Sequence, residues 1–508
     1  MNLIASTSIF GFFTLISRIL GYVRDILIAI FLGTSLFADV FFVAFRLPNT
    51  FRRLFAEGTF NAAFIPSYAG ELAKNKLEAD QFAKNIFNLL FIILLFLVLV
   101  AEIFMPQLIF LIAPGFYNDP DKLKLAIDLS RITFPFLFFI SLASFFGAIL
   151  NSYNKFAAAA AAPIILNIVL IVSLIFSQLI SIPTVLLLSY AVSFAGFLQL
   201  ILLLFFVRNF FKPILSFKIK VNAKVSFFFK KLLPSIFSSG VTQINILVGT
   251  IIASFQTGAV SYLYYADRVY QINLAVAGIA VGTVMLPELS KYVKNKNLEN
   301  IINLQNRALE LCLFLSIPAS VALVLASEQI ITSLFGYGSF DKESVNNTAL
   351  ALTFFAFGVP AFSLLKIFSN FFFARNNTKI PFYLSLISVT LNIVISVSLF
   401  SKVGFVIIPI ATSISSWINV FMHYYLIKKK DLHIFDPKFI YKLPRMILSV
   451  VVMGAVLYLM LGFFSDKFDY NDSWKFIYLF IIVAISIVIY FLISNFSGAF
   501  KFKDIKFK

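Results

Sequence analysis

Charged residues are scarce in this chain of 508 residues, at 13% of the sequence, whereas hydrophobic residues make up 60%. An ordinary soluble domain is about 25% charged. No stretch rich in proline, glycine or serine divides the chain into soluble units. The shortage of charge excludes a soluble fold, which would lack the polar surface to cover so many apolar side chains, and indicates that lipid surrounds most of the chain.

Residues that commonly build chemical sites are also few. The single cysteine, Cys312, lies in an apolar segment and is interpreted as a small hydrophobic residue. One cysteine permits no disulfide within the chain. Two histidines, His423 and His433, do not make a metal site. The sequence has no G-x-x-x-x-G-K-[S/T] motif, which argues against ATP hydrolysis. We therefore expect neither an enzyme nor a bound cofactor or metal.

Apolar segments long enough to span a bilayer, about 20 residues each, recur along the whole chain. They are much longer than the alternating ten-residue strands of an outer-membrane barrel, and a segment in lipid must satisfy its own backbone groups, so we predict an all-α integral membrane protein of about fourteen transmembrane helices. The predicted segments are 5–32, 36–68, 85–112, 130–153, 158–180, 183–207, 226–254, 258–288, 308–335, 347–374, 380–400, 404–427, 444–464 and 475–495.

The formal net charge of +18 would suggest nucleic-acid binding in a soluble protein. Here most lysines and arginines fall in the even-numbered loops and the tail, and only a few, such as Lys122 and Lys124, fall in odd-numbered loops. The positive-inside rule then places both termini of this multi-pass membrane protein in the cytoplasm. No nucleic-acid partner is expected. The first segment lacks a small-residue cleavage site and is interpreted as a retained helix.

The sequence contains a faint internal repeat at an offset of about 220 residues. In the first copy a turn at Gly33 precedes Pro66, and in the second a turn at Gly258 precedes Pro287. Asn167 of the first copy matches Asn392 of the second. One copy contains six segments, an even number, so the two copies enter the membrane with the same orientation, as parallel lobes with the substrate path between them. Chance similarity of apolar sequences is the alternative. The predicted domains are 1–215, 216–430 and a C-terminal hairpin with a basic tail, 431–508.

Charged residues at bilayer depth are costly and usually face a bundle interior or a wet cavity. In the first segment, Ser17, Arg18, Gly21, Arg24 and Asp25 fall within about one third of the helix circumference at 100° per residue. The segment therefore carries one polar stripe on an otherwise lipid-compatible helix.

Two further segments add charge. The second segment carries Asp39, and a group of polar residues follows Pro48 in the same segment. The eighth segment carries Asp267 and Arg268. Three neighbouring pairs are alternatively structural ion pairs or interfacial residues: Arg24 with Asp25, Arg53 with Glu57, and Asp267 with Arg268. The polar group after Pro48 consists of Asn49, Arg52, Arg53 and Glu57.

The net charge of these residues is positive even after pairing, which favours an anionic ligand. Guanidinium groups offer paired hydrogen bonds to phosphate and stay ionised, whereas proton or metal-cation transport would require unpaired carboxylates. The sequence thus predicts a secondary transporter or facilitator for a ligand with clustered anionic oxygens.

Several long motifs resemble the MurJ/MviN family of flippases, which carry lipid II, the undecaprenyl-diphosphate-linked peptidoglycan precursor. The resemblance covers most of the first twelve segments, whereas the final hairpin matches only in position and hydrophobicity. The motifs are SRILGYVRD (Ser17–Asp25), ADVFFVAFRLPNTFRRLFAEGTFNAAFIP (Ala38–Pro66), APGF (Ala113–Phe116), ITFPFLFFISLASFFGAILNSYNKF (Ile132–Phe156), YYADRV (Tyr264–Val269) and GTVMLPELSK (Gly282–Lys291).

This resemblance implies a MATE-like fold of two six-helix lobes that open alternately to each side, plus two helices that form a groove for the polyprenyl tail. Acidic sodium ligands known in some relatives are not evident here. The implied partners are lipid II, membrane lipids and other cell-wall synthesis proteins. The implied substrate-binding residues are Arg18, Arg24, Arg52, Arg268, Ser17 and Asn49, and the gating or structural residues are Asp25, Asp39, Arg53, Glu57, Ser261 and Asp267.

Three other functions compete with this interpretation. A polysaccharide-unit flippase or a multidrug exporter of the same superfamily is the nearest, but an exporter of cationic drugs would need acidic cavity residues. A membrane-embedded enzyme acting on polyprenyl-linked sugars would need a cluster of histidines or carboxylates that the short loops do not offer. A structural scaffold would not need the polar stripe.

Overall fold

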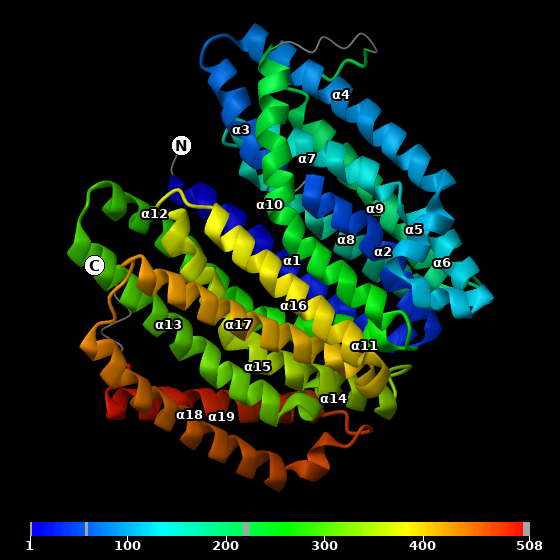
Figure 1. Ribbon diagram of the computed structural model, residues 1–508. Coiled ribbons are helices and arrows are strands. Elements are labelled where there is room, and N and C mark those ends of the chain that lie inside the picture. The colour runs from blue at the N-terminus through cyan, green and yellow to red at the C-terminus, as the bar shows by residue number, and fades with distance from the viewer. Residues whose placement is uncertain (1–2, 56–58, 217–222, 501–508) are drawn as a thin grey trace. The chain divides into compact units, whose positions relative to one another are not determined.

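The computed structural model describes residues 3–55, 59–216 and 223–500, and within these ranges the regular elements are helical (Figure 1). The α-helices are α1 (Leu3–Leu32), α2 (Leu36–Phe55), α3 (Thr59–Leu72), α4 (Lys76–Ile103), α5 (Met105–Ile112), α6 (Pro120–Thr133), α7 (Phe136–Ser152), α8 (Phe156–Phe176), α9 (Thr184–Val207), α10 (Ala223–Ala253), α11 (Ala259–Leu274), α12 (Val281–Lys294), α13 (Leu298–Leu325), α14 (Ser327–Phe335), α15 (Lys342–Phe373), α16 (Lys379–Val403), α17 (Ile407–Lys429), α18 (Pro437–Phe463) and α19 (Lys475–Ser497).

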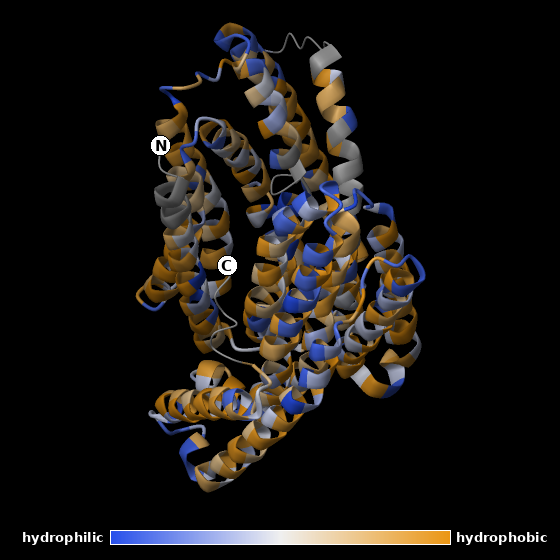
Figure 2. Ribbon diagram, turned by 90° about the vertical axis from the view of Figure 1, so that its left-hand side faces the viewer, coloured by the Kyte–Doolittle hydropathy of each residue, from blue (hydrophilic) through white to orange (hydrophobic). Residues whose placement is uncertain are grey.

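The all-α membrane fold is confirmed. Among the described residues, 10 helical stretches are long and apolar enough to cross a membrane, and hydrophobic residues predominate along the helices (Figure 2). One of the ten, Lys379–Lys429, consists of two helices that meet at Gly404 and pack together. The charged helices α1 and α2 are not among the ten. Each of the fourteen predicted segments lies largely on helix where the structure describes it, with short breaks such as residues 134–135 and 177–180.

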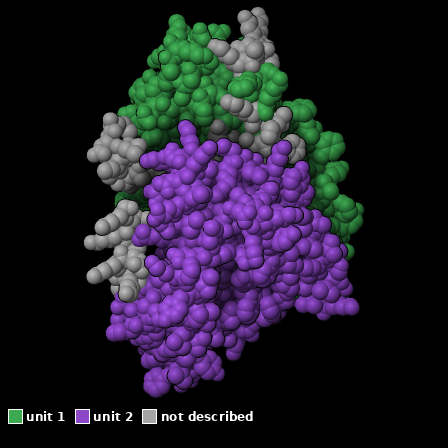
Figure 3. Space-filling view, turned by 60° about the vertical axis from the view of Figure 1, so that its left-hand side comes forward, with its two compact units in different colours: residues 1–260 green, residues 261–508 purple. Residues whose placement is uncertain are grey.

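The chain forms two compact units, Met1–Val260 and Ser261–Lys508 (Figure 3). This division differs by one helix from the predicted lobe boundary after residue 215, because α10 packs on α3, α2, α5 and α4 of the first unit. The predicted boundaries stay predictions.

The two units repeat the same packing. In the first, α3 packs on α4 and α7, and α9 packs on α7 and α8; in the second, α12 packs on α13 and α15, and α17 packs on α15 and α16. The turns agree as well, since Gly33 and Gly258 have φ of 57° and 77°, and Asn154 and Asn376 have φ of 58° and 57°. These left-handed conformations favour Gly and Asn, which explains why the residues recur at matching places.

Aromatic side chains fill the core of the first unit. Phe60, Phe64 and Tyr68 follow each other one turn apart on α3 and stack in sequence, with ring centroids 5.3 and 5.5 Å apart. Phe145 of α7 and Phe228 of α10 pack against the same column. Four-residue spacing places these rings on one helix face, so α3 holds its neighbours through a single aromatic face.

The C-terminal hairpin of α18 and α19 packs on α13 and α14 within the second unit. Lys475, which is fully buried, donates hydrogen bonds to the carbonyl oxygens of Gly336 (2.7 Å) and Tyr470 (2.6 Å). At the other end, the Tyr490 hydroxyl donates to the Phe314 carbonyl oxygen at 2.8 Å. The hairpin is therefore fixed at both ends, which its hydrophobicity alone would not require.

Candidate functional site

The polar stripe of α1 contacts α8. Arg24 is buried and donates from Nε and Nη2 to Asp25 Oδ1, at 3.0 and 2.6 Å, and from Nη1 to Asn167 Oδ1 of α8, at 3.0 Å. Asn167 Nδ2 in turn donates to the Ser17 carbonyl oxygen at 2.8 Å. Gly21 faces the Asn167 amide, so the two helices approach closely there. The stripe thus supports a buried polar network between α1 and α8.

Arg18 differs from Arg24 although both lie on the same stripe. Its side chain is exposed, whereas that of Arg24 is buried and bonded to Asp25 and Asn167. An exposed guanidinium can accept a ligand without first breaking a buried ion pair. Arg18 is therefore the exposed arginine of the α1 stripe, whereas Arg24 belongs to the buried network.

The residues after Pro48 lie on the last two turns of α2. Arg52 is half-buried and donates from Nε to Asn49 Oδ1 at 2.9 Å, so Asn49 orients the guanidinium. Arg53 is also half-buried on the same turn. Glu57, its predicted partner, lies outside the described residues.

Asp39 sits in a buried ion pair that the sequence did not reveal. Its Oδ2 accepts from Lys122 Nζ of α6 at 3.1 Å and from the Gly258 amide at 2.8 Å. Neither charged side chain is appreciably exposed, and the Lys122 ammonium also lies 4.2 Å from the centre of the Phe116 ring. The interpretation of Lys122 as a loop cation is therefore wrong. Asp119, which caps the first turn of α6, fixes the start of this helix.

In the second unit, Asp267 and Arg268 bond to different partners. Gln271 Nε2 donates to Asp267 Oδ2, and Arg268 Nη2 donates to the Tyr264 hydroxyl at 2.9 Å. The Arg268 guanidinium also lies over the Tyr264 ring, 4.8 Å from its centre. Ser261, on the first turn of α11, is fully buried. One face of α11 thus carries an oriented guanidinium.

The structure brings Ser17, Arg24 and Asp25 into one network, and Asn49 and Arg52 into another. Sequence reasoning assigned Asn167 only to the repeat and overlooked Arg46, whose Nη1 donates to Thr250 Oγ1. A signal for Asn167 was present, because an amide in an apolar helix requires a polar partner. Among the described residues, no group of three or more His, Cys, Asp or Glu side chains is placed to hold a metal ion.

The repeated helix packing and the ten long apolar stretches among the described residues define a multi-pass helical membrane protein, and solved transporters have this fold. An inward-facing multidrug resistance MATE transporter of the MOP superfamily superposes with a TM-score of 0.67 at 15% identity, covering 82% of this chain and 94% of that chain. This match shows the fold alone. The family model described as "Lipid II flippase MurJ" matches residues 28–497. The chain therefore belongs to the MurJ lipid II flippase family.

Individual relatives agree with this assignment. Probable lipid II flippases of Rhizobium meliloti and Rickettsia prowazekii are each 39% identical, over 90% and 85% of this chain and 86% of the relative in both cases. A solved lipid II flippase MurJ in an inward closed conformation superposes with a TM-score of 0.81 at 29% identity, covering 96% of this chain and 98% of that chain. Family and fold thus agree over nearly the whole length.

Proposed function

We propose that this chain is a lipid II flippase, a transporter and not an enzyme, that moves the diphosphate-linked muropeptide from the cytoplasmic to the periplasmic leaflet. The observation that carries the proposal is the family match over residues 28–497, supported by 39% identity to relatives described as probable lipid II flippases. The basic character of its charged helices is consistent with an anionic headgroup and does not favour an exporter of cationic drugs.

Arg18, Arg52 and Arg268 bind the diphosphate in this proposal. Asn49 orients Arg52 and Tyr264 orients Arg268, which lowers the entropy lost on binding. Arg24 contributes indirectly in this proposal. Its hydrogen bonds to Asp25 and Asn167 hold α1 in place, and α1 also carries Arg18. Arginine suits a diphosphate better than lysine because its planar group makes paired hydrogen bonds.

Alternating access follows from the family and from the internal repeat. The diphosphate is held first from one side of the membrane and then from the other, and each step requires a difference in affinity between the two conformations. The proposed location is the bacterial inner membrane with both termini in the cytoplasm, in agreement with the basic even-numbered loops. Other cell-wall synthesis proteins are proposed as partners because they supply and consume the same substrate.

The proposal is tested by expressing the chain in a flippase-depleted bacterium and measuring lipid II exposed on the outer face. The unaltered chain should restore growth and exposure, and Arg18→Ala should abolish both. Arg208→Ala is the matched control, because Arg208 is also exposed but lies at the end of α9, beside Phe205. It should retain full activity at equal membrane abundance. Failure of the unaltered chain to expose lipid II would refute the function, and full activity of Arg18→Ala would refute the site.

A further inference from the structure

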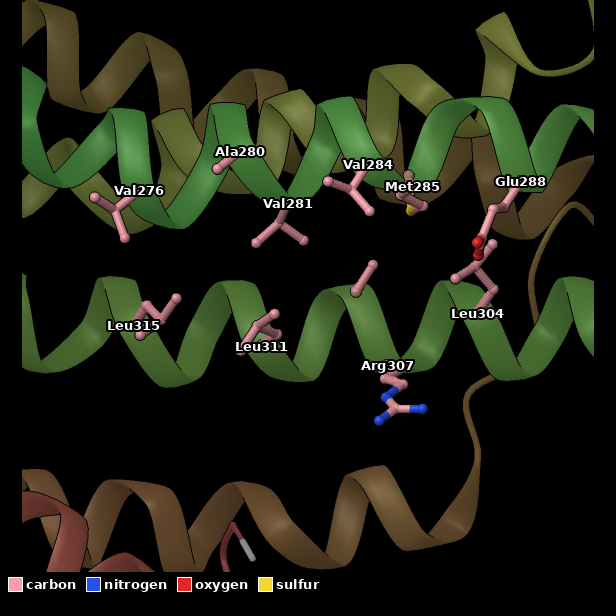
Figure 4. Close-up of a pocket in the computed structure, with 11 residues that line it drawn as sticks. Val276, Ala280, Val281, Val284, Met285, Glu288, Leu304, Arg307, Leu311 and Leu315 are labelled. Atoms are coloured by element: carbon pink, nitrogen blue, oxygen red, sulfur yellow. The ribbon is translucent and has the colours of Figure 1, made fainter. Parts of the chain in front are cut away.

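A groove runs between two antiparallel helices of the second unit, away from the charged residues discussed above. One wall is the π-helical segment Ala275–Ala280 continued by α12, and the other is α13. The groove encloses about 260 Å³, and its lining is almost entirely aliphatic. Figure 4 shows Val276 and Leu315 at one end and Glu288 and Leu304 at the other.

The shape of the groove depends on how its π-helical wall packs against α15. On its far side this segment presses against α15, where a Cβ on Gly278 would lie 2.9 Å from the Cα of Ser363. Asn370 of α15 donates to the Gly282 carbonyl oxygen at 2.7 Å and holds the next turn in place. The small side chain of Ala280 then faces the groove. Single π-turns often mark functional positions in helices.

The length of the groove matches one leaflet. From Val276 to Glu288 the wall rises about 18 Å at 1.5 Å per residue, and half of a hydrocarbon core is about 15 Å. Glu288 lies at the end nearer to the short connection between α12 and α13. The exposed Lys294 ends α12, and the exposed Lys296 lies in this connection. The groove therefore extends from headgroup level into the hydrocarbon of a single leaflet.

The headgroup end carries charges of both signs. Glu288 is exposed on the groove, and the exposed Lys291 follows it one turn later on α12. Side chains three residues apart on a helix are about 5–6 Å apart. Arg307 of α13 lines the same end and extends away from α12 (Figure 4). A carboxylate with a cation one turn away on the same helix complements a headgroup that carries an ammonium and a phosphate.

We propose that this groove binds one acyl chain of an aminophospholipid of the phosphatidylethanolamine type. Glu288 accepts hydrogen bonds from the ammonium, and Lys291 faces the phosphate. A trimethylated ammonium cannot donate to Glu288, and a glycerol headgroup offers no cation. The site should therefore discriminate among phosphatidylethanolamine, phosphatidylcholine and phosphatidylglycerol with identical chains.

The test counts lipids retained by the purified full-length chain in native mass spectrometry, with each of the three palmitoyl-oleoyl lipids added in turn. The unaltered chain should retain one phosphatidylethanolamine at least about tenfold more tightly than the other two lipids. Glu288→Gln should remove this preference while leaving phosphatidylcholine binding unchanged. Counting bound lipid does not require transport, so the result is independent of the proposed function.

Two valines provide a matched pair for the groove itself. Val284, which lines the groove, and Val451, on α18, are 58% and 60% exposed. Val284→Trp should weaken retention about tenfold, and Val451→Trp should not change it. Equal retention of the three lipids, or an unchanged Val284→Trp variant, would overturn the proposal. Displacement of the retained lipid by equimolar undecaprenyl phosphate would also overturn it and would assign the groove to an isoprenoid chain.

Discussion

At the scale of single residues, the buried ion pair between Asp39 and Lys122 is costly to disrupt. Asp39 is fully buried and Lys122 is 4% exposed. Removing one partner of a buried pair leaves an uncompensated charge and costs about 3–5 kcal/mol, whereas replacing both partners is much less harmful. The pair is thus a strong local constraint between α2 and α6 without being a large net source of stability.

A double-mutant cycle tests this view. Asp39→Asn and Lys122→Met should each lower the free energy of unfolding by about 3 kcal/mol, and the double variant should lose clearly less than the sum of the two. Unfolding in mixed micelles with increasing sodium dodecyl sulfate provides the measurement. Additive losses would show that the two side chains do not interact in the folded protein.

Residue types predicted part of the candidate site, because ionisable groups are rare in apolar helices. The stripe of α1 led directly to Arg24, Asp25 and Ser17. The role of Lys122 could not be predicted, since its partner lies 83 residues away in sequence and its neighbours are polar. Pairing across such a separation depends on helix packing, which hydrophobicity does not specify.

At the scale of elements, the segment between α17 and α18 is held by side chains of α13 and by Arg375, which follows the end of α15. Asn306 donates to the Ile434 carbonyl oxygen at 2.9 Å, and Arg375 donates to that of Leu432 at 3.0 Å. His433 Nδ1 lies 3.0 Å from Gln305 Oε1, to which it donates in the neutral state. Burial, and to a smaller extent the nearby Arg375 guanidinium, lowers the pKa of His433 to about 4.

This lowered pKa predicts a loss of stability in mild acid. Between pH 6.5 and pH 4 the unfolded chain binds a proton at His433 that the folded chain does not, so stability falls as the pH falls. The loss at pH 5 should be about 2 kcal/mol. The thermal unfolding midpoint should drop between pH 7 and pH 5 by more in the unaltered chain than in His433→Phe. Equal drops would contradict the prediction.

Hydropathy located the membrane-spanning elements but not their irregularities. The fourteen predicted segments lie largely on helix where they are described, because length and apolar character are sufficient to place a helix in lipid. The π-turn at Ala275–Ala280 was not predicted, since it depends on how Gly278 and Ser363 approach each other. The helix count by itself also does not specify that α10 packs on α3, α2, α5 and α4.

For the whole molecule, the basic loops predict the orientation in the membrane. Lys294 and Lys429, both exposed, should face the cytoplasm, and the exposed Asp121 and Asp469 should face the periplasm. In a Cys312→Ala background, an impermeant thiol reagent added to intact spheroplasts should label Asp121→Cys and Asp469→Cys. It should reach Lys294→Cys and Lys429→Cys only after lysis. Labelling of the latter pair in intact spheroplasts would reverse the assigned orientation.

The contacts of Asp39 also bear on how the chain is made. Its partner Lys122 emerges from the ribosome 83 residues later, but its second donor, the Gly258 amide, emerges 219 residues later. At about 5–20 residues per second, translation needs roughly 10–40 s to cover that distance. Until Gly258 has been made, the carboxylate lacks the hydrogen bond from its amide. The nascent first unit must therefore persist in the membrane with one of its buried hydrogen bonds still missing.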